Sequence, residues 1–341
     1  MLSKEELKKL HTNQRLLVME LQKRNVDCKI VDLNLELLLA SYNGHKEFLL
    51  DRDSSITPYA ASVIAGDKAL SKSLLIENDV SVPKGQAFNP DEINQALIYA
   101  QRSGFPLVAK PVFGSHGDDV YMNLENLLDV KLAIDKIQKR PRQFLIEEQF
   151  FGKEYRIFVT KDKKCAILHR EPAHVIGNGK DTIETLAKKE SENRMKETDD
   201  NLFPRKNSLC PIQLNEEAKR YLKRSNLDFL YVPQNKEKVY LQATSNVAKG
   251  GVCIDYTDIV HPSVIDISYK ALKTFPGLPY AGIDFLSKDI TKKQEPNDYR
   301  ILEVNTVPGI HMHMRPGRGK SRDVATYIAD LVFPETKIRG K

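Results

Sequence analysis

The sequence predicts an α+β protein with antiparallel sheets, because several expected strands follow one another with no helix between them. The segments QFLIEEQF and EYRIFVT are two strands separated only by a turn at Gly152, and KCAILHR follows as a third. Such short connections are typical of antiparallel pairing, since parallel strands need a long crossover. The chain of 341 residues is long enough for two or three packed subdomains.

Composition and charge argue against several classes of protein. The formal net charge of +6 is modest, and basic and acidic residues are interspersed, unlike the basic clusters of nucleic-acid proteins. The charged start MLSKEELKKL is unlike a signal peptide, and no apolar run approaches the roughly 20 residues of a membrane span. We therefore expect a cytoplasmic protein with no nucleic-acid or membrane partner. Its four cysteines form no C-x-x-C pair, which fits a reducing compartment: Cys28, Cys165, Cys210 and Cys253.

Residues 1–60 are predicted to form a short α/β lead-in. Ser3 and Glu6 have the spacing of a capping box, and leucines then recur at helical spacing over residues 4–24. The pair Asn43-Gly44 lies between two apolar runs, which is a strong signal for a β-hairpin.

The rest of the chain contains further predicted helices and strands, without an internal repeat. In the segment 88–105, Pro90 lies near the start of the predicted helix and Gly104 lies just past its end, as is typical of helix boundaries. The expected helices cover residues 67–78, 88–105, 262–275 and 326–333, and the expected strands cover residues 106–113, 143–150, 154–160, 164–170, 239–244, 280–286 and 299–305.

Two conspicuous motifs near the C-terminus lack the context that their usual functions need. The tripeptide GKS at 319–321 resembles the end of a phosphate-binding P-loop, but Met314 stands where that loop needs a glycine. His311 and His313 are two apart and would share one face of a strand, yet no further Cys or His lies nearby to complete a zinc site. We expect neither a P-loop nor zinc, and the histidines either contact substrate or are structural.

Three polar residues on two expected strands form a better candidate. Glu303 and Asn305 are two apart, so both side chains lie on one face, and Asp284 lies in another strand between apolar neighbours. Two carboxylates and an amide oxygen are hard ligands that suit Mg²⁺. The alternative is a solvated sheet face, and these residues alone favour neither interpretation.

Upstream segments carry groups that suit a nucleotide. Lys110 ends a buried strand before the Gly-rich stretch FGSHGDD, and Lys68 opens a helix, where the helix dipole favours an anion. Each lysine is placed to hold phosphate, although each could equally be a surface residue. The segment EEQFFGKE could supply an apolar slot for adenine and a carboxylate for ribose, through Glu147, Glu148, Phe150 and Glu154. By itself, however, the segment is interpreted more simply as an edge strand and a turn with ordinary surface charges.

The order of these segments resembles the ATP-grasp superfamily. The matching pieces are IAGDKALSK, VAKPVFGSHGDDV, IEEQFFGKEYRIFV, HREPAHVIGNGKDTI, SNVAKGGVCIDYTD, GIDF, EVNTVPG and HMHMRPGRGK. Within the superfamily they are most similar to the module that cyanophycin synthetase shares with bifunctional bacterial glutathione synthetase. The likeness runs from about residue 54 to 335, and its strength lies in the order of the pieces rather than in any one of them.

The resemblance implies a fold, cofactors and an activity. ATP would be held between two antiparallel-sheet subdomains in residues 61–335, with residues 84–153 covering the nucleotide. The cofactors would be ATP and Mg²⁺, with two ions expected and Mn²⁺ as an alternative. The reaction would join a small-molecule carboxylate to an amine, through an acyl phosphate and with release of ADP. A homodimer, an impaired nucleotide-binding regulator and a kinase that stops at phosphoryl transfer are left open.

The resemblance also implies residue roles. ATP would be bound by Lys68, Lys110, Gly114, Ser115, His116, Gly117, Glu147, Glu148, Phe150 and Glu154. The metal ligands would be Asp284, Glu303 and Asn305, and the catalytic cations would be Arg156, Arg170 and Lys110. The substrates would lie near Asn246, Gly250, Gly251, His313 and Arg315.

Two segments depart from the family pattern. Asp118 and Asp119 stand where the phosphate-covering loop usually carries a small or basic residue and a glycine, and carboxylates there would repel phosphate. Gln242 and Ala243 stand where glutathione-forming relatives carry Arg and Glu, which argues against glutathione as the product.

Overall fold

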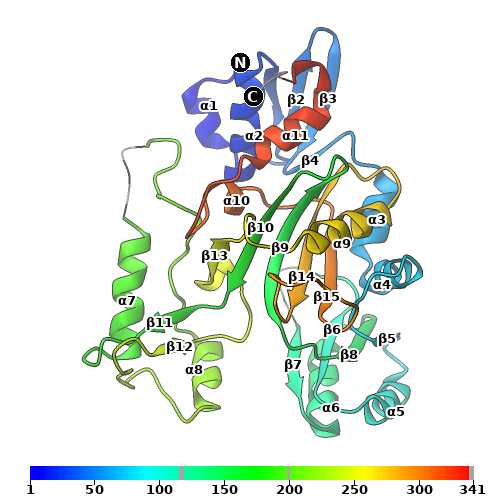
Figure 1. Ribbon diagram of the computed structural model, residues 1–341, viewed down its shortest axis with the longest axis vertical. Coiled ribbons are helices and arrows are strands. Elements are labelled where there is room, and N and C mark those ends of the chain that lie inside the picture. The colour runs from blue at the N-terminus through cyan, green and yellow to red at the C-terminus, as the bar shows by residue number, and fades with distance from the viewer. Residues whose placement is uncertain (115–118, 197, 199, 338–341) are drawn as a thin grey trace. The chain divides into compact units, whose positions relative to one another are not determined.

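The computed structural model (Figure 1) describes residues 1–114, 119–196, 198 and 200–337. It divides into two compact units. The first unit contains residues 1–57, 164–258 and 307–341, and the second contains residues 58–163 and 259–306. Both units combine helices with antiparallel strands, which confirms the predicted α+β class. In the described part of the chain, no helix is long and apolar enough to cross a membrane.

The first unit begins with two helices, α1 (Lys4–Lys9) and α2 (Thr12–Lys23), where the sequence predicted one helix over residues 4–24. The capping box of Ser3 and Glu6 starts α1, as expected. The single-helix prediction was wrong because the chain becomes extended at Leu10. The Arg15 side chain from α2 donates to the carbonyls of Leu7 and Leu10 at 2.8 Å each, and so satisfies groups that a continuous helix would have bonded internally.

A four-stranded antiparallel sheet follows these helices. Its strands β1 (Asp27–Asp32), β2 (Leu37–Tyr42), β3 (His45–Leu50) and β4 (Asp53–Ser54) pair in sequence order, and Asn43 and Gly44 form the predicted hairpin turn with positive φ angles. The late helix α11 (Val324–Val332) packs against α2, so the two ends of the described chain share one core.

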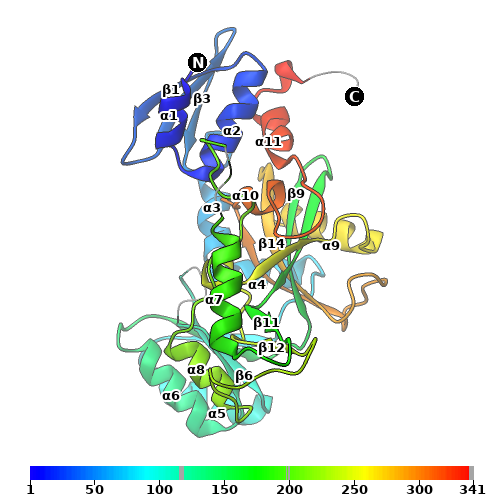
Figure 2. The same ribbon diagram turned by 90° about the vertical axis from the view of Figure 1, so that its left-hand side faces the viewer.

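The remainder of the first unit contains two antiparallel strand pairs. β10 (Cys165–Glu171) pairs with β13 (Val252–Asp255), and β11 (His174–Ile176) pairs with β12 (Lys238–Tyr240). Helix α7 (Ile183–Arg194) lies beside β11 (Figure 2), and the two elements share a buried apolar cluster. Helix α8 (Glu216–Lys223) adds Leu222 to this cluster. The predicted strand 239–244 is therefore much shorter than expected, and β13 was not predicted.

The second unit contains a sheet with two chemically different faces. Its strands β5 (Gly85–Phe88), β6 (Leu107–Pro111), β7 (Tyr121–Leu124) and β8 (Phe144–Glu148) pair in the order β5-β8-β6-β7. Helices α5 (Ile93–Ser103) and α6 (Leu127–Ile137) pack on one face, where they bury Ala109 and Ile146 (Figure 1). Because side chains alternate along a strand, Lys110 and Glu147 project from the other face.

The second unit also contains three long strands side by side. β9 (Lys153–Thr160), β14 (Tyr280–Ser287) and β15 (Tyr299–Asn305) are antiparallel, with β14 in the centre. Helices α3 (Tyr59–Gly66) and α4 (Lys68–Glu77) contact β15, and α9 (Pro262–Lys273) contacts β9 and β14. The predicted division at residue 60, and the covering role of residues 84–153, stay predictions.

A buried ion pair gives the first testable prediction. Arg24, the C-cap of α2, bonds Glu20 at 2.8 Å and Asp330 of α11 at 2.7 Å, and its side chain is 3% exposed. Changing Arg24 to Leu leaves Asp330 with Lys164 as its remaining partner. We expect the free energy of unfolding, measured by urea denaturation, to fall by about 3 kcal/mol.

The neighbouring Lys23 is the matched control, because it also faces Glu20 but its side chain is 70% exposed. Lys23→Leu should change the unfolding free energy by no more than about 0.5 kcal/mol. Equal effects of the two substitutions would contradict the assignment of Arg24 as the buried tie between α2 and α11.

Candidate functional site

Three strands place one side chain each in a row across the second unit. Arg156 of β9 is the cross-strand partner of Asp284 of β14, and Asp284 is the partner of Glu303 of β15. Directly opposed residues point to the same face of a sheet, with Cβ atoms about 5 Å apart. The Nε atom of Arg156 lies 2.9 Å from the Asp284 carboxylate. One cation and two carboxylates, all predicted site residues, therefore share this face.

Asn305 extends the row by one step along β15. It is the cross-strand partner of Gly282, which precedes Asp284 by two residues and so lies on the same face. The Asn305 amide nitrogen donates to the Gly282 carbonyl at 3.3 Å. That bond leaves the amide oxygen as the group of Asn305 that can bind a cation.

The oxygen donors of Asp284, Glu303 and Asn305 fit a hard divalent cation. Asp284 is 8% exposed and a carboxylate so buried needs a positive partner, which Arg156 now provides. Among the residues that the structure describes, no three His, Cys, Asp or Glu side chains converge on one point. Two carboxylates and an amide, completed by water and phosphate oxygens, match the preferences of Mg²⁺ rather than those of zinc.

A second group of predicted residues lies on β6 and β8. Glu147 faces Gly85 on one side and Val108 on the other, and Lys110 is two residues beyond Val108 on the same face. A Cβ atom at position 85 would stand 2.6 Å from the Cβ of Glu147, so the glycine makes room for the carboxylate. The Lys110 ammonium lies 2.5 Å from one oxygen of Glu147.

Lys72 joins this group and was not predicted. It is one turn after Lys68 on α4, and its ammonium contacts the second carboxylate oxygen of Glu147. Burial, and after it the charge of Lys110, holds the pKa of Lys72 well below its usual range. Burial, and then Lys68, lowers the pKa of Lys110 to about 8. The spacing of four residues in DKALSK was the available signal, since it places both lysines on one helix face.

Lys68 lies between the two groups. Its ammonium donates to the Gly114 carbonyl at 2.6 Å and stands 3.9 Å from Glu303. The helix N-terminus beside it is already capped, because the Asp67 carboxylate accepts hydrogen bonds from the amides of Ala69 and Leu70. A phosphate here would therefore be held by the Lys68 side chain rather than by free helix amides.

The stretch after Gly114 is only partly described. Three residues of the predicted ATP-binding set, and Asp118, lie outside the described residues: Ser115, His116 and Gly117. Asp119 is described, and its carboxylate forms an ion pair with Arg142 and accepts a hydrogen bond from the Tyr121 hydroxyl at 3.4 Å. Arg142 thus supplies a positive charge to a carboxylate that would otherwise repel phosphate.

The segment after β8 is held by a residue that the sequence did not reveal. Arg300 of β15 bonds the Glu148 carboxylate at 2.8 Å, and its guanidinium lies 4.8 Å from the centre of the Phe150 ring. Glu154, at the start of β9, is two residues before Arg156 and lies on the same face. Arg300 was missed because its ion pair joins β15 to Glu148 of a different sheet, 152 positions away in the chain.

The remaining predicted residues belong to the first unit. Arg170 in β10 is the cross-strand partner of Cys253, and Asn246 caps a short 3-10 helix, η1 (Val247–Lys249). Gly250 has a φ angle of +100°, and a Cβ on it would come within 2.6 Å of Ile212. Buried Arg194 donates to the Gly250 carbonyl at 2.8 Å, so this turn has a structural reason for its glycine.

His311 and His313 lie in a short helix, α10 (His311–Met314), and not on a strand. The shared face that a strand would have given them therefore does not apply. His313 is fully buried, and Asn13 of α2 accepts hydrogen bonds from the backbone amides of Ile310 and His311 at 2.9 Å each. Local periodicity could not identify α10, because four residues carry too little pattern.

Arg315 directly follows α10 and packs on the segment between α7 and α8. Its guanidinium lies 4.5 Å from the centre of the Phe203 ring and donates to the Lys206 carbonyl at 3.1 Å. The nearby GKS tripeptide forms no phosphate loop: Lys320 pairs with Asp258 at 2.7 Å in an irregular segment.

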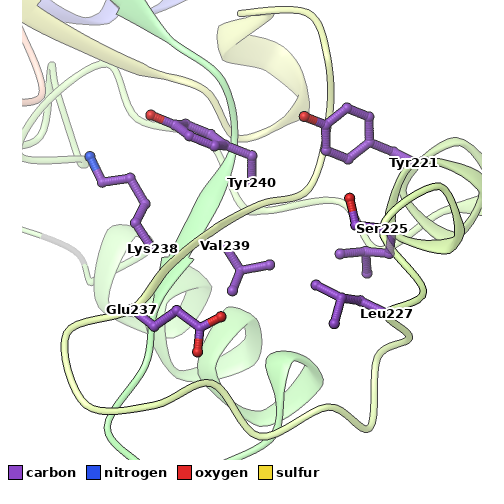
Figure 3. A pocket seen from close by; sticks show the side chains of 8 residues that line it. Tyr221, Ser225, Leu227, Glu237, Lys238, Val239 and Tyr240 are labelled. Atoms are coloured by element: carbon purple, nitrogen blue, oxygen red, sulfur yellow. The ribbon is translucent and has the colours of Figure 1, made fainter.

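The first unit also contains a small pocket of about 190 Å³ between α8 and β12 (Figure 3). Leu227 and Val239 lie at its apolar side, and Tyr221, Glu237 and Tyr240 surround it. None of the predicted site residues lines this pocket among the residues that the structure describes.

The fold and the row of site residues define the class of the protein. Residues 65–176 match the family model described as a RimK-like ATP-grasp domain. The chain therefore contains an ATP-grasp domain, and the predicted resemblance is confirmed. Enzymes of this family use ATP and a divalent metal ion.

Individual relatives agree with this assignment. The chain is 31% identical to the glutathione biosynthesis bifunctional protein GshAB of Clostridium perfringens over 95% of its own length. It is also 31% identical to cyanophycin synthetase of Geminocystis herdmanii over 97% of its length. The crystal structure of a bifunctional glutathione synthetase from Pasteurella multocida superposes with a TM-score of 0.71 at 25% identity, covering 97% of this chain and 45% of the other. The chain spans 41% and 38% of the two curated relatives.

The lowered pKa of Lys110 gives a prediction for ATP binding. Lys110 can attract phosphate only while it is protonated, and its pKa of about 8 places the loss of charge within the working range of most enzymes. The dissociation constant for ATP, measured by calorimetry with Mg²⁺ present, should be level below pH 7.5. It should rise towards about tenfold per pH unit well above pH 8, because the bound state then requires a proton.

Lys110→Arg is the matched variant, since a guanidinium stays protonated throughout this range. Its ATP affinity can be lower overall but should not change between pH 7.5 and 9.5. A wild-type affinity that is also constant over this range would contradict a phosphate-binding role for the Lys110 ammonium.

Proposed function

We propose that this chain is an ATP-dependent ligase that joins a carboxylate to an amine, with an acyl phosphate as intermediate. The observation that carries the proposal is the row of Arg156, Asp284 and Glu303, with Lys68 and Lys110 in the same unit. Such a site can hold a metal-bound triphosphate and neutralise the charge of a phosphoryl group in transfer. The family match supports the same activity.

In this proposal the nucleotide is bound by the second unit. The ammonium groups of Lys68 and Lys110 contact the phosphates, and the phosphate loop begins at Gly114. Glu147 accepts a hydrogen bond from the adenine amino group, the backbone around Glu148 and Phe150 reads the ring edge, and Glu154 accepts from the ribose hydroxyls.

Asp284, Glu303 and Asn305 would hold two Mg²⁺ ions, and Mn²⁺ could replace them. When bound, these ions neutralise charge on the phosphate oxygens and on the leaving ADP. Arg156, which now contacts Asp284 at 2.9 Å, is then available to the transferred phosphoryl group. The three oxygen ligands keep their spacing because strand pairing fixes it.

The reaction has two balanced steps. A carboxylate oxygen of the acid substrate attacks the γ-phosphorus, the bond to the β-phosphate oxygen breaks, and ADP leaves. The amine then attacks the acyl carbon, inorganic phosphate leaves, and the nitrogen loses a proton. Arg156 and Arg170 stabilise the oxygens on which charge accumulates, as catalysis by positioning and electrostatics requires.

We propose amino acids or short peptides as substrates. The named relatives are a glutathione biosynthesis protein and cyanophycin synthetase. Asn246, Gly250, Gly251, His313 and Arg315 would lie near the acid and the amine. Gln242 and Ala243 depart from the glutathione-forming pattern, so a different product is favoured. A cytoplasmic location and a homodimer complete the proposal.

The proposal is tested by trapping the acyl phosphate with hydroxylamine, which converts it to a hydroxamate. Mixtures of amino acids and dipeptides are incubated with ATP and Mg²⁺, and ADP, hydroxamate and product mass are measured. Glu303→Gln removes a charged metal ligand and should lower ADP formation by about a hundredfold or more. The fold should survive, because the Glu303 side chain is 28% exposed.

Asp266→Asn is the control, because Asp266 belongs to the same unit and its exposed side chain pairs with Lys163 on the surface. Its ADP formation should equal that of the wild type. ATP-dependent ADP release that needs both an acid and an amine supports a ligase. A stable phosphorylated product without an amine would favour a kinase instead, and full activity of Glu303→Gln would refute the metal assignment.

A further inference from the structure

The Lys72–Glu147–Lys110 cluster contains a residue for which the proposed function has no role. Glu147 is 2% exposed, and each of its carboxylate oxygens contacts a different ammonium group, Lys72 on one side and Lys110 on the other. Lys72 and Lys110 are each 7% exposed. Charged side chains are rarely buried to this extent unless they are paired with an opposite charge, as these three are.

The two lysines reach Glu147 from different elements. Lys110 is on β6, in the same sheet as Glu147, whereas Lys72 is on α4. Asp67 caps the start of α4, and the buried Ser71 and Leu75 anchor the helix on both sides of Lys72. The helix therefore presents the Lys72 ammonium at a fixed place beside the carboxylate.

The proposed function makes unequal demands on the two lysines. Lys110 would turn towards the phosphates when ATP binds, and its ammonium would then stabilise the ionised form of Glu147 less. The charge of Lys110 is, after burial, the second cause of the lowered pKa of Lys72, so Lys72 would be more readily protonated once Lys110 has turned away and would remain as the cation beside the carboxylate. A buried carboxylate without a cation takes up a proton readily, because burial disfavours its charged form.

The protonation state of Glu147 decides which base it can recognise. An ionised carboxylate only accepts hydrogen bonds, with about four lone-pair directions, of which the lysines use two. The exocyclic amino group of adenine can donate to one that remains. Hypoxanthine and guanine carry a carbonyl oxygen at that ring position. An ionised carboxylate repels this oxygen, because both groups are hydrogen-bond acceptors. A protonated carboxyl group could donate to that oxygen instead.

We propose that Lys72 is a positioning residue for nucleobase selectivity. It holds Glu147 ionised and in place, so that the site accepts adenine and rejects bases with a carbonyl at the same position. This inference rests on the proposed function, since it assumes that Glu147 faces the base. It adds a residue on α4, outside the sheet that carries Glu147, to the determinants of specificity.

The test compares the binding of ATP and ITP, which differ at this ring position. Dissociation constants are measured by calorimetry with Mg²⁺ for the wild type, Lys72→Met and Lys72→Arg. The wild type should bind ATP more tightly than ITP. In Lys72→Met, the ratio of the dissociation constants for ITP and ATP should fall by about tenfold, because one mismatched buried hydrogen bond typically costs about that much. Lys72→Arg keeps a cation beside Glu147 and should retain most of the preference.

Lys131→Met is the control, because Lys131 lies in the same unit and pairs with Asp135 on the surface of α6, with its side chain 56% exposed. Its nucleotide preference should equal that of the wild type. A second variant, Glu147→Gln, presents an amide that can donate, and it should also narrow the ratio. It keeps the test decisive if Lys72→Met does not fold.

The outcomes separate this inference from the proposed function. A wild-type protein that binds neither nucleotide would overturn both. Selective wild-type binding, with an unchanged ratio in Lys72→Met or in Glu147→Gln, would overturn the role of Lys72 alone. Equal weakening of ATP and ITP binding in Lys72→Met would make Lys72 a merely structural residue and would also overturn the inference.

Discussion

The register of three antiparallel strands is the constraint on which the candidate site depends. Pairing between β9, β14 and β15 sets Arg156, Asp284 and Glu303 opposite one another, so their spacing is fixed by backbone hydrogen bonds rather than by flexible side chains. A shift of one residue would send the Asp284 or Glu303 side chain to the opposite face. The apolar residues between them, such as Ile283 and Val304, are buried and hold the register in place.

Charge balance is the second constraint, because the site contains many charges in little space. Lys68, Lys72 and Lys110 gather near Glu147 and Glu303, and burial together with the charge of Lys68 lowers the pKa of Lys110. Clustered like charges are unfavourable in the free protein, and a polyphosphate would relieve that repulsion. The same arrangement that costs stability therefore favours an anionic ligand, which is why perturbed lysines are informative about function.

Part of the fold and of the candidate site could be predicted from the sequence, and the features that could not be predicted have physical reasons. Alternation on a strand places Glu303 and Asn305 on one face without any tertiary information, and the hairpin at Asn43 follows from turn chemistry. Lys72 could not be assigned, because its role depends on how α4 packs against a sheet. The break at Leu10 was missed for a similar reason, since the apolar spacing continues across it while the bonds from Arg15 decide where α1 ends.

The central claim is that Asp284, Glu303 and Asn305 bind the divalent cation that accompanies ATP. Crystals grown with Mn²⁺ and a non-hydrolysable ATP analogue would test it most directly, because manganese is located by its anomalous scattering. Anomalous peaks are expected within about 2.3 Å of the side-chain oxygens of these three residues and beside the nucleotide phosphates. Manganese bound to the nucleotide elsewhere, with Arg156 still paired to Asp284, would contradict it.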